Sequence, residues 1–422
     1  MNDASAWHRP EKSPGSVLTS VELFAGAGGL GMGLTLAGFR HRAVIERDQW
    51  ACDTIRRNQA LGHKLVSGWP LHQADVRDIA YDSIAGPIDV VAGGPPCQPF
   101  SMGGQHKGHD DARDMFPTMA EAVRRLRPRA FIVENVKGLT RAGFADYFAY
   151  IVARLTFPEL ARARGETWTD HARRLRQHAT SPGCDGLSYN VSFRLLNAAD
   201  YGVPQKRERV FIVGFRNDLD VDWSFPPPTH SRETLLADQW VTGQYWERHR
   251  MPRYQRDTST RVLRDRGTGE ASAWRTVRDA LCGLPDPEFD PEAARRFPDH
   301  RFQPGVKFYP GHTGSVPDLP AKTLKAGDHG VPGGENALVR PDGTGRYFTV
   351  RESARLQTFP DDYVFEGSWS EAMRQLGNAV PVTLAHAVGA SVARALTARD
   401  TPARLRAPCP SRDNSVLSIL TQ

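Results

Sequence analysis

The chain of 422 residues has little cysteine and no evident way to pair it. Its five cysteines are widely spaced, their number is odd, and none belongs to a CxxC pair. This pattern argues against a disulfide framework and against a structural zinc site, and it favours a reducing cytosol.

Long apolar runs are missing as well. Residues 1–16 are polar and lack the hydrophobic stretch of a signal peptide, and no later stretch approaches the length that spans a bilayer. There is no internal repeat and no extended low-complexity tract. We therefore expect a soluble, cytoplasmic protein without a membrane partner.

A large excess of charge of one sign is also absent. The formal net charge of +6 is small beside 54 basic and 48 acidic residues. Most of the basic residues are arginine, which suits contacts with phosphates and base edges. A nucleic-acid partner is thus only weakly indicated, because a GC-rich genome would produce the same bias.

What the first half of the chain does have is an alternation of short β-type runs and helical patterns. This alternation predicts an α/β fold with a parallel sheet, whose functional residues gather at the carboxyl ends of the strands. The predicted strands are Ser20–Phe24, Ala43–Glu46, Leu71–Ala74, Ile88–Ala92, Phe131–Val133, Tyr189–Leu196 and Val210–Phe215. The predicted helices are Leu30–Ala37, Gln49–Gln59, Phe116–Leu126 and a polar helix within Trp168–His178.

The pattern changes after Arg216 and becomes regular again near Val350. Three consecutive prolines, Pro226–Pro228, mark the boundary, and arginines then interleave with aromatic residues. We predict a disordered N-terminus (1–16), a first domain (17–224), a smaller domain of loops and short strands (225–345), a segment that packs back on the first domain (346–398) and a disordered tail (399–422).

A stiff loop holds one cysteine directly after an apolar strand. The segment Gly93–Ser101 reads Gly-Gly-Pro-Pro-Cys-Gln-Pro-Phe-Ser. Its prolines fix φ around Cys97 and exclude a helix, while its two glycines permit a sharp turn off the strand. An unpaired cysteine is most often a buried structural residue, but this setting favours a reactive thiol.

A second loop is rich in glycine and opens a helix. Gly26, Gly28 and Gly31 match the GxGxxG pattern after a strand, and Glu46 ends the next strand, where it could accept from ribose hydroxyls. A dinucleotide site and a turn without any ligand both fit this pattern.

Two neighbouring residues favour a different nucleoside ligand. Phe24 precedes the first glycine and offers a flat face for an adenine or a sulfonium-bearing ligand. Asp75 closes the third predicted strand, where it could accept from an adenine amino group. S-adenosylmethionine presents one adenosine and no pyrophosphate, so it needs stacking and carboxylates rather than a phosphate cradle.

A carboxyl group follows the strand predicted next to the one that leads to Cys97. Glu134 comes directly after Phe131–Val133. A thiolate and a carboxyl group at neighbouring strand ends suit conjugate addition to a pyrimidine: the thiolate attacks C6 while the protonated carboxyl bonds N3, and C5 then takes a methyl group from a sulfonium. Alone, Glu134 would more simply form a salt bridge; with Cys97 it predicts catalysis.

Two further segments carry charge. Gln205–Arg209 places Arg207 and Arg209 on one face, where they could hold a base carbonyl, a phosphate or the cysteine loop, or form a solvated basic turn. The stretch Met102–Arg113 contains His and Asp, but its glycines and the lack of a second ligand pair argue against a metal. We interpret it as a lid over the thiol, with Lys107 reaching towards phosphate.

Together these segments resemble the DNA (cytosine-5)-methyltransferase family of bacterial restriction–modification systems. The resemblance covers about residues 18–216 and 345–395, in the family's order. The matching pieces are Phe24–Gly29, Gly94–Ser101, Glu134–Val136, Gln205–Arg209, Arg351–Gln357 and Gly377–Val380. Glu22 stands where the family usually has aspartate, and Pro158–Pro182 is an insertion that the compact members lack.

The resemblance implies a Rossmann-like S-adenosylmethionine-dependent methyltransferase sheet with a smaller, loop-rich target-recognition domain at 225–345. It implies methylation at C5 of a cytosine flipped out of double-stranded DNA. The implied catalytic residues are Cys97, Glu134 and Arg207. The implied cofactor residues are Phe24, Gly26, Gly28, Glu46, Asp75 and Asn378. DNA contacts are expected at Ser101, Lys107, Arg209, Thr323 and Leu324.

Other functions remain open at this point. A nicotinamide-dependent oxidoreductase fits the glycine turn but leaves Cys97 and Glu134 unexplained. A tRNA cytosine-5 methyltransferase would use the same chemistry, although the Cys-Phe-Thr segment of that group is absent. A catalytically inactive DNA-binding module disagrees with the intact motifs. We expect a monomer that protects host DNA from a cognate restriction endonuclease without forming a stable complex with it.

Overall fold

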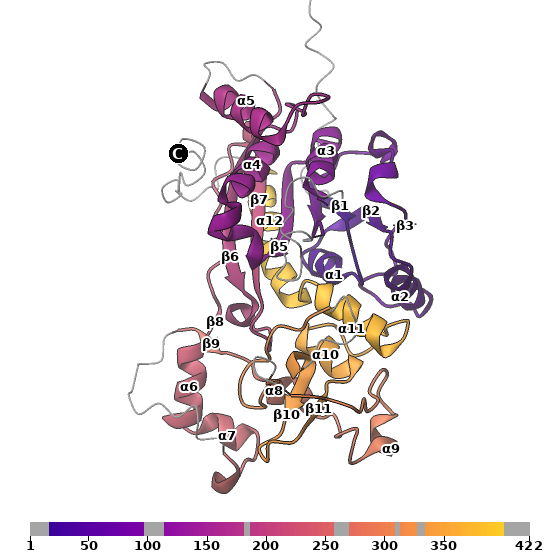
Figure 1. Ribbon diagram of the computed structural model, residues 1–422, viewed down its shortest axis with the longest axis vertical. Helices are drawn as coiled ribbons and strands as arrows, with labels where there is room; N and C mark the ends of the chain where they lie inside the picture. The colour runs from indigo at the N-terminus through magenta and orange to yellow at the C-terminus, as the bar shows by residue number, and fades with distance from the viewer. Residues whose placement is uncertain are drawn as a thin grey trace, which may run out of the picture.

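The computed structural model shows an elongated molecule with a sheet towards one end and short helices and loops at the other (Figure 1). It describes residues 17–96, 114–180, 186–256, 270–308, 313–326 and 334–400. The segments predicted to be disordered therefore lie outside the described residues, except for the last two residues of the final helix.

Within the described residues, seven strands form the main sheet in the order β3-β2-β1-β4-β5-β7-β6. Neighbouring strands from β3 to β5 are parallel, and β7 runs antiparallel to β5 and β6. The strands are β1 (Thr19–Leu23), β2 (Arg40–Glu46), β3 (Leu71–Gln73), β4 (Val90–Gly93), β5 (Ala130–Val136), β6 (Tyr189–Asn197) and β7 (Glu208–Arg216). The predicted α/β class is confirmed, and each predicted strand is present with small shifts at its ends.

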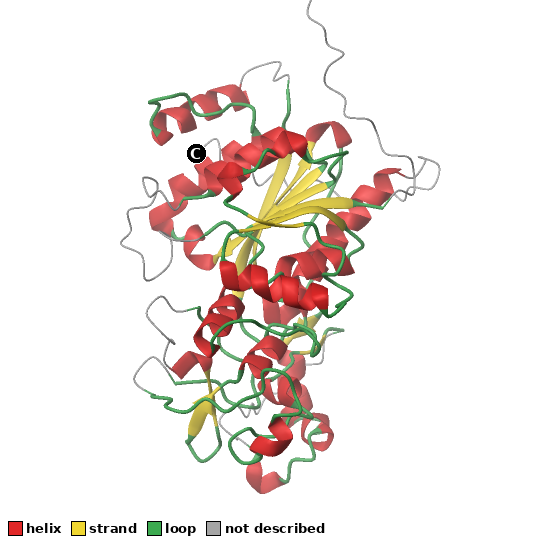
Figure 2. Cartoon of the chain, turned by 90° about the vertical axis from the view of Figure 1, so that its right-hand side faces the viewer, coloured by secondary structure: helices red, strands yellow, loops and turns green. Residues whose placement is uncertain are grey.

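Alternate side chains of the sheet enter two separate cores, because successive residues of a strand point to opposite faces. Val91 and Phe131 pack with α3 and α4, whereas Val90 and Ile132 pack with α1 and α12. Figure 2 shows the sheet enclosed between these helical layers. The helices of this part are α1 (Gly29–Leu36), α2 (Gln49–Ala60), α3 (Phe116–Leu126), α4 (Ala145–Thr156), α5 (Trp168–Thr180), α10 (Val350–Leu356), α11 (Trp369–Asn378) and α12 (Val382–Asp400).

The helices α1, α2, α3 and α5 confirm the predictions, but α4 was missed. One side of α4 packs on the sheet through residues such as Ile151, and its tyrosines Tyr147 and Tyr150 contact Trp168 of α5. Apolar side chains therefore surround much of the helix, and the one-sided stripe that reveals a surface helix is blurred.

The C-terminal helix packs back on the first part of the chain, as expected. Gly33 of α1 lies so close to Ala385 of α12 that a Cβ on the glycine would clash. By length and composition, the helical stretch Trp369–Ala398 could cross a membrane, so the expectation that no such stretch exists was wrong. Its apolar window is 67% buried within the protein, as is typical of a core helix.

The region 225–345 contains more helix than predicted. Its core includes Tyr245 and Trp246, which are almost fully buried, and Trp274. Aromatic residues that looked like part of an arginine-rich contact surface thus partly form a core of their own. The elements here are α6 (Arg232–Trp240), α7 (Gln244–Arg248), α8 (Val277–Leu281), α9 (Pro291–Ala294), β8 (His230–Ser231), β9 (Ser272–Ala273), β10 (Ala337–Val339) and β11 (Gly345–Tyr347).

Candidate active site at the carboxyl edge of the sheet

The register of the parallel strands brings the predicted site to one edge of the sheet. Leu23 pairs with Ile45 and with Gly93, and Gly93 pairs with Val133. Leu23, Ile45, Gly93 and Val133 are therefore level with one another, and the residue that follows each of them lies at the same edge of the sheet. The strand order reverses between β1 and β4, where sheets of this kind open a ligand crevice. The four residues are Phe24, Glu46, Gly94 and Glu134.

The turn after β1 is strained at its aromatic residue. Phe24 has a φ of 58°, a left-handed conformation that bulky side chains rarely adopt. Gly26 and Gly28 follow with φ of 55° and 92°, which only glycine adopts without cost. Backbone strain of this kind persists where the surroundings hold a functional side chain in place. The half-buried ring of Phe24 is thereby fixed beside Gly93.

Glu46 closes this turn from the neighbouring strand. Its Oε2 accepts from the amide of Gly26 at 2.7 Å, and its Oε1 accepts from the amides of Arg47 and Asp48 at 2.8 and 2.7 Å. A carboxylate offers about four acceptor positions. Glu46 is therefore rigidly held and keeps capacity for one further donor, such as a ribose hydroxyl.

Asp75 lies just past β3, as expected, but its carboxylate is already engaged. Arg77 donates to it from Nε at 2.9 Å and from Nη2 at 2.7 Å, and Arg47 approaches at 3.4 Å. Hydrogen bonding to Arg77 holds the pKa of Asp75 well below its usual range. Asp75 also caps a short turn through the Arg77 amide. These contacts leave it less free for an adenine amino group than the sequence predicts.

Asn378 reaches the same crevice from the other end of the chain. It is exposed at the end of α11. Two residues later, the carbonyl of Val380 lies so close to Gly29 that a Cβ on this glycine would clash. The end of α11 and the glycine turn are therefore in direct contact, and a shared ligand remains the prediction for Asn378.

A fully buried carboxyl group lies beneath the glycine turn. Glu22 sits beside Gly31 and Trp69, and a Cβ on Gly31 would clash with both. Burial raises the pKa of Glu22 to about 8, the charge of Glu46 adds to the shift, and the Gly31 backbone opposes it. Glu22 is therefore mostly protonated at neutral pH.

The stability of the protein is expected to fall as the pH rises from 4.5, the ordinary pKa of this carboxyl group, through about 8. The unfolded chain releases the Glu22 proton near the lower value and the folded chain near the higher one, so the contribution is fully present only below the lower value. Glu22→Gln stays neutral and should flatten the profile.

Melting temperatures of the wild type and Glu22→Gln between about pH 6 and pH 9 test this. Burial lowers the pKa of His41 from 6.5 to about 4, so its contribution is lost as the pH falls through this interval, and it cancels in the comparison because both proteins contain His41. Parallel profiles for the two proteins would contradict the assignment to Glu22.

At the same edge of the sheet, but on β5, Glu134 lies next to an arginine. Glu134 is buried at the end of β5, and its Oε1 lies 2.9 Å from Nε of Arg209 on β7. Burial raises the pKa of Glu134 above its ordinary value, although the charges of Arg209 and Arg207 oppose the rise. A carboxyl group in this setting retains a proton more readily than one in water.

The chain that leads to Cys97 passes directly beside Glu134. A Cβ on Gly94 would lie 3.0 Å from Oε2 of Glu134. The side-chain Nδ2 of Asn135 donates to the backbone carbonyl of Pro95 at 3.0 Å. Sequence reasoning gave Asn135 no role; its signal was its place directly after Glu134 at a strand end. Cys97, Ser101, Lys107 and the predicted lid Met102–Arg113 lie outside the described residues.

Both arginines predicted to act at the base or at DNA are engaged by partners within the protein. Arg209, expected at DNA, meets Glu134. Arg207, expected near the bound base, is fully buried, and its guanidinium donates to backbone carbonyls. The reason is that two segments distant in the sequence cover the start of β7, and their backbone carbonyls surround the Arg207 guanidinium. These carbonyls belong to Leu324, Gly377 and Ala379, at 3.0, 2.6 and 2.9 Å.

In the Thr-Leu pair expected to contact DNA, Thr323 is half-buried and Leu324 is buried. Thr323 Oγ1 donates to the carbonyl of Lys206 at 2.7 Å. Leu324 is 1% exposed and packs with Phe348 and Leu356. Contact of this pair with DNA stays a prediction, and the burial of Leu324 leaves its side chain little surface for such a contact.

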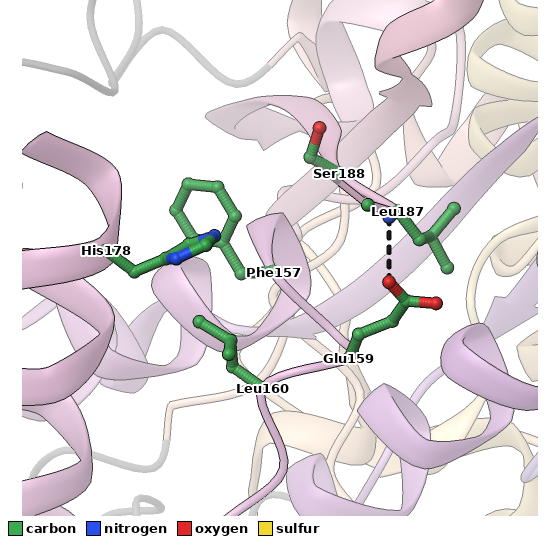
Figure 3. A pocket seen from close by; sticks show the side chains of 7 residues that line it. Phe157, Glu159, Leu160, His178, Leu187 and Ser188 are labelled. Atoms are coloured by element: carbon green, nitrogen blue, oxygen red, sulfur yellow. Dashed lines mark hydrogen bonds between the residues drawn. The ribbon is translucent and has the colours of Figure 1, made fainter. Parts of the chain in front are cut away.

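A small pocket of about 100 Å³ lies away from this edge, beside α5 (Figure 3). Glu159 in its wall accepts from the amide of Leu187 at 2.9 Å. The lining residues are Phe157, Glu159, Leu160, His178, Gly186, Leu187 and Ser188. In the part of the chain that the structure describes, no three or more His, Cys, Asp or Glu residues gather as a metal site would require.

Comparison with known proteins gives one family. The sequence profile described as C-5 cytosine-specific DNA methylase matches residues 18–157 and 183–394. The unmatched residues 158–182 coincide with the predicted insertion. The Type II methyltransferase M.Eco47II of Escherichia coli is 31% identical over 409 residues, which cover 93% of this chain and 82% of that protein. M.PspPI of a Psychrobacter strain is 30% identical over 392 residues, which cover 91% and 81%.

Solved structures agree on the fold. A DNA modification methyltransferase encoded within an E. coli prophage superposes with a TM-score of 0.56 at 22% identity, covering 90% of this chain and 99% of that one. The Dnmt2 methyltransferase of S. pombe superposes with a TM-score of 0.52 at 19% identity, covering 90% and 98%.

Proposed function

The chain belongs to the C-5 cytosine-specific DNA methylase family, and from this membership we propose how its own residues perform the reaction. The protein is a DNA cytosine C5 methyltransferase of the restriction–modification type. The observation that carries the mechanism is the buried Glu134, which lies beside both Arg209 and the chain leading to Cys97.

Cys97 acts as the nucleophile that attacks C6 of the target cytosine. Glu134 donates a hydrogen bond to N3 from its protonated form, which burial favours, so that charge on the ring is neutralised as the Cys97–C6 bond forms. C5 then accepts the methyl group, loses its proton and regains the ring double bond as Cys97 leaves. Asn135 supports these steps by holding the carbonyl of Pro95 at the start of the cysteine loop.

Arg209 takes the place first given to Arg207. Its contact with Glu134 fixes the direction of the carboxyl group. Its remaining guanidinium donors can reach a base carbonyl beside the bonded N3, which the fork geometry of arginine suits. Arg207 is then a structural neighbour of the site.

S-adenosylmethionine is the cofactor of this family, and when bound it supplies an electrophilic methyl group on a sulfonium. The residues present fit it. Phe24 offers a fixed aromatic face, Glu46 keeps capacity for a ribose hydroxyl, and Asn378 is exposed two residues before Val380, whose carbonyl meets Gly29 in the turn that follows Gly26 and Gly28. Asp75 contributes mainly by holding Arg77 and Arg47.

Double-stranded DNA is the substrate, and the cytosine must leave the helix because C6 is shielded inside it. The region 225–345 serves as the target-recognition domain, in which phosphate contacts position the duplex and base contacts select the site. The protein acts in the cytoplasm as a monomer and pairs functionally with a restriction endonuclease. A tRNA substrate is the alternative, because the base chemistry is the same.

Transfer of tritiated methyl groups tests the assignment. The protein is incubated with labelled S-adenosylmethionine and either duplex DNA or tRNA, and bisulfite sequencing then maps the modified cytosines. We expect label in 5-methylcytosine of duplex DNA at one recurring sequence. Label in tRNA alone, or in adenine, would contradict the proposal.

A further inference from the structure

Arg207 stands where three segments meet that are far apart in the sequence. It lies just before β7, and its guanidinium is fully buried. Nη1 donates to the carbonyl of Leu324 in the 225–345 region, and Nη2 donates to the carbonyls of Gly377 and Ala379 at the end of α11. One side chain thus ties the sheet, the recognition region and the C-terminal segment together.

The two carbonyls at the end of α11 flank Asn378. Nη2 of Arg207 fixes the residues on both sides, while Asn378 itself stays exposed. The Gly377 carbonyl lies in the planar peptide unit that joins Gly377 to Asn378, and the Ala379 carbonyl lies one peptide unit further on, so holding both restrains the backbone from which the Asn378 side chain projects. Arg207 therefore orients a predicted cofactor residue that it does not touch.

The junction is packed too closely for one segment to move alone. In the segment Leu324–Ala326, the backbone of Lys325 and Ala326 lies so near Gly377 that a Cβ there would clash. Gln205 accepts from the first amide of that segment at 2.9 Å and donates to the carbonyl of Leu356 at 3.2 Å. Displacing the segment would take these partners from the buried Oε1 acceptor of Gln205 and the buried Nη1 donor of Arg207, which costs more than an ordinary hydrogen bond contributes.

We propose that Arg207 is a positioning residue through which cofactor binding and DNA engagement strengthen each other. The proposal rests on the functions assigned above to Asn378 and to the region 225–345. A cofactor that contacts Asn378 favours the closed junction, which in turn fixes Leu324–Ala326 where the recognition region meets the sheet. Such coupling is reciprocal, so DNA tightens cofactor binding by the same factor as the cofactor tightens DNA binding.

If Arg207 only stabilised the fold, its replacement would lower stability without changing the coupling between cofactor and DNA. Arg351 provides a matched control for this case. Arg351 is also fully buried against three backbone carbonyls. Its partners are the carbonyl oxygens of Pro298, Pro360 and Tyr363, at 3.0, 3.0 and 2.8 Å. Lysine cannot reproduce the arginine fork at either place. Both replacements should lower the melting temperature, but only Arg207 touches the residues that flank Asn378.

The test compares the wild type, Arg207→Lys and the control Arg351→Lys. S-adenosylhomocysteine is the probe, and calorimetry gives its Kd with and without a duplex that contains the site methylated by the wild type. In the wild type and the control, the duplex should tighten Kd by about 5- to 150-fold. In Arg207→Lys, the ratio of the Kd without the duplex to the Kd with it should fall to within about twofold of one.

A wild-type ratio of one, or an unchanged ratio in Arg207→Lys, would overturn the proposal. Failure of the wild type to methylate any duplex would count against the proposed function instead. Hydrogen–deuterium exchange at Leu324–Ala326 gives a second result that needs no DNA. S-adenosylhomocysteine should slow this exchange in the wild type and in Arg351→Lys, but not in Arg207→Lys. Unaltered exchange in the wild type would overturn the proposal even if Arg207→Lys failed to fold.

Discussion

Replacement of Cys97 by alanine is expected to lower methyl transfer to DNA by a factor on the order of 10⁴ or more. Without the thiolate, no covalent bond forms at C6, and C5 is too weak a nucleophile to take the methyl group. DNA binding should change little, because phosphate contacts dominate affinity. Single-turnover rates on a labelled duplex measure the first effect, and a filter-binding assay measures the second.

A duplex that carries 5-fluorocytosine at the target gives an independent readout of the same step. Fluorine replaces the C5 hydrogen and cannot leave as a proton does, so after methyl transfer the wild type should remain covalently attached and Cys97→Ala should not. The exposed thiol of Cys282 in the recognition region provides the control. Cys282→Ala should trap the duplex as the wild type does. A stable adduct with Cys97→Ala would refute the nucleophile.

Replacement of Glu134 by glutamine is expected to lower the rate of methyl transfer by about 10²- to 10⁴-fold. Glutamine keeps the shape of the side chain and can bond N3, but it has no acidic proton to share as charge develops on the ring. It also leaves Arg209 without its carboxylate partner at 2.9 Å. The rate of adduct formation with 5-fluorocytosine should fall in parallel, which places the defect no later than methyl transfer.

The pH profile and a neighbouring glutamate make this prediction specific. Because burial raises the pKa of Glu134, its active protonated form is lost as the pH rises through that pKa. The Cys97 thiolate becomes more abundant as the pH rises, so the effect of Glu134 is a fall in rate on the alkaline side of the wild-type profile, which the variant should lack. Glu208 adjoins Arg209 but is exposed and paired with Lys137 at 2.9 Å. Glu208→Gln should stay within about twofold of the wild type, and an equal loss in both variants would argue against a chemical role for Glu134.

The sheet was predictable because its strands have two unmistakable features. They are short, and their apolar residues run without a break where both faces are covered by helices, as in Val90–Gly93. Register then followed from the fold class, so Phe24, Glu46 and Glu134 could be placed at one edge before any coordinates were known. Helix α4 was hidden because neighbours cover more than one of its sides.

The two arginines show where sequence reasoning ended. Arg207 and Arg209 are two residues apart near the start of one strand, so they share a face and the same chemistry. Which of them meets Glu134 depends on how far β5 extends and on which carbonyls surround the other. These are tertiary facts, set by segments more than a hundred residues away. Asp75 repeats the lesson, since the arginine that engages it lies on a turn with no periodic signal.

The packing of α12 on the sheet also dictates when this protein can finish folding during synthesis. A nascent chain that has passed β7 already contains the strands of the sheet described above, yet one face, including Ile132 and Val213, still lacks the cover provided by Leu384, Val388 and Val392. That surface stays exposed while the ribosome translates the residues between β7 and α12. The enzyme therefore matures only after α12 has been made, and a message cut before α12 would yield a chain prone to aggregation rather than a working fragment.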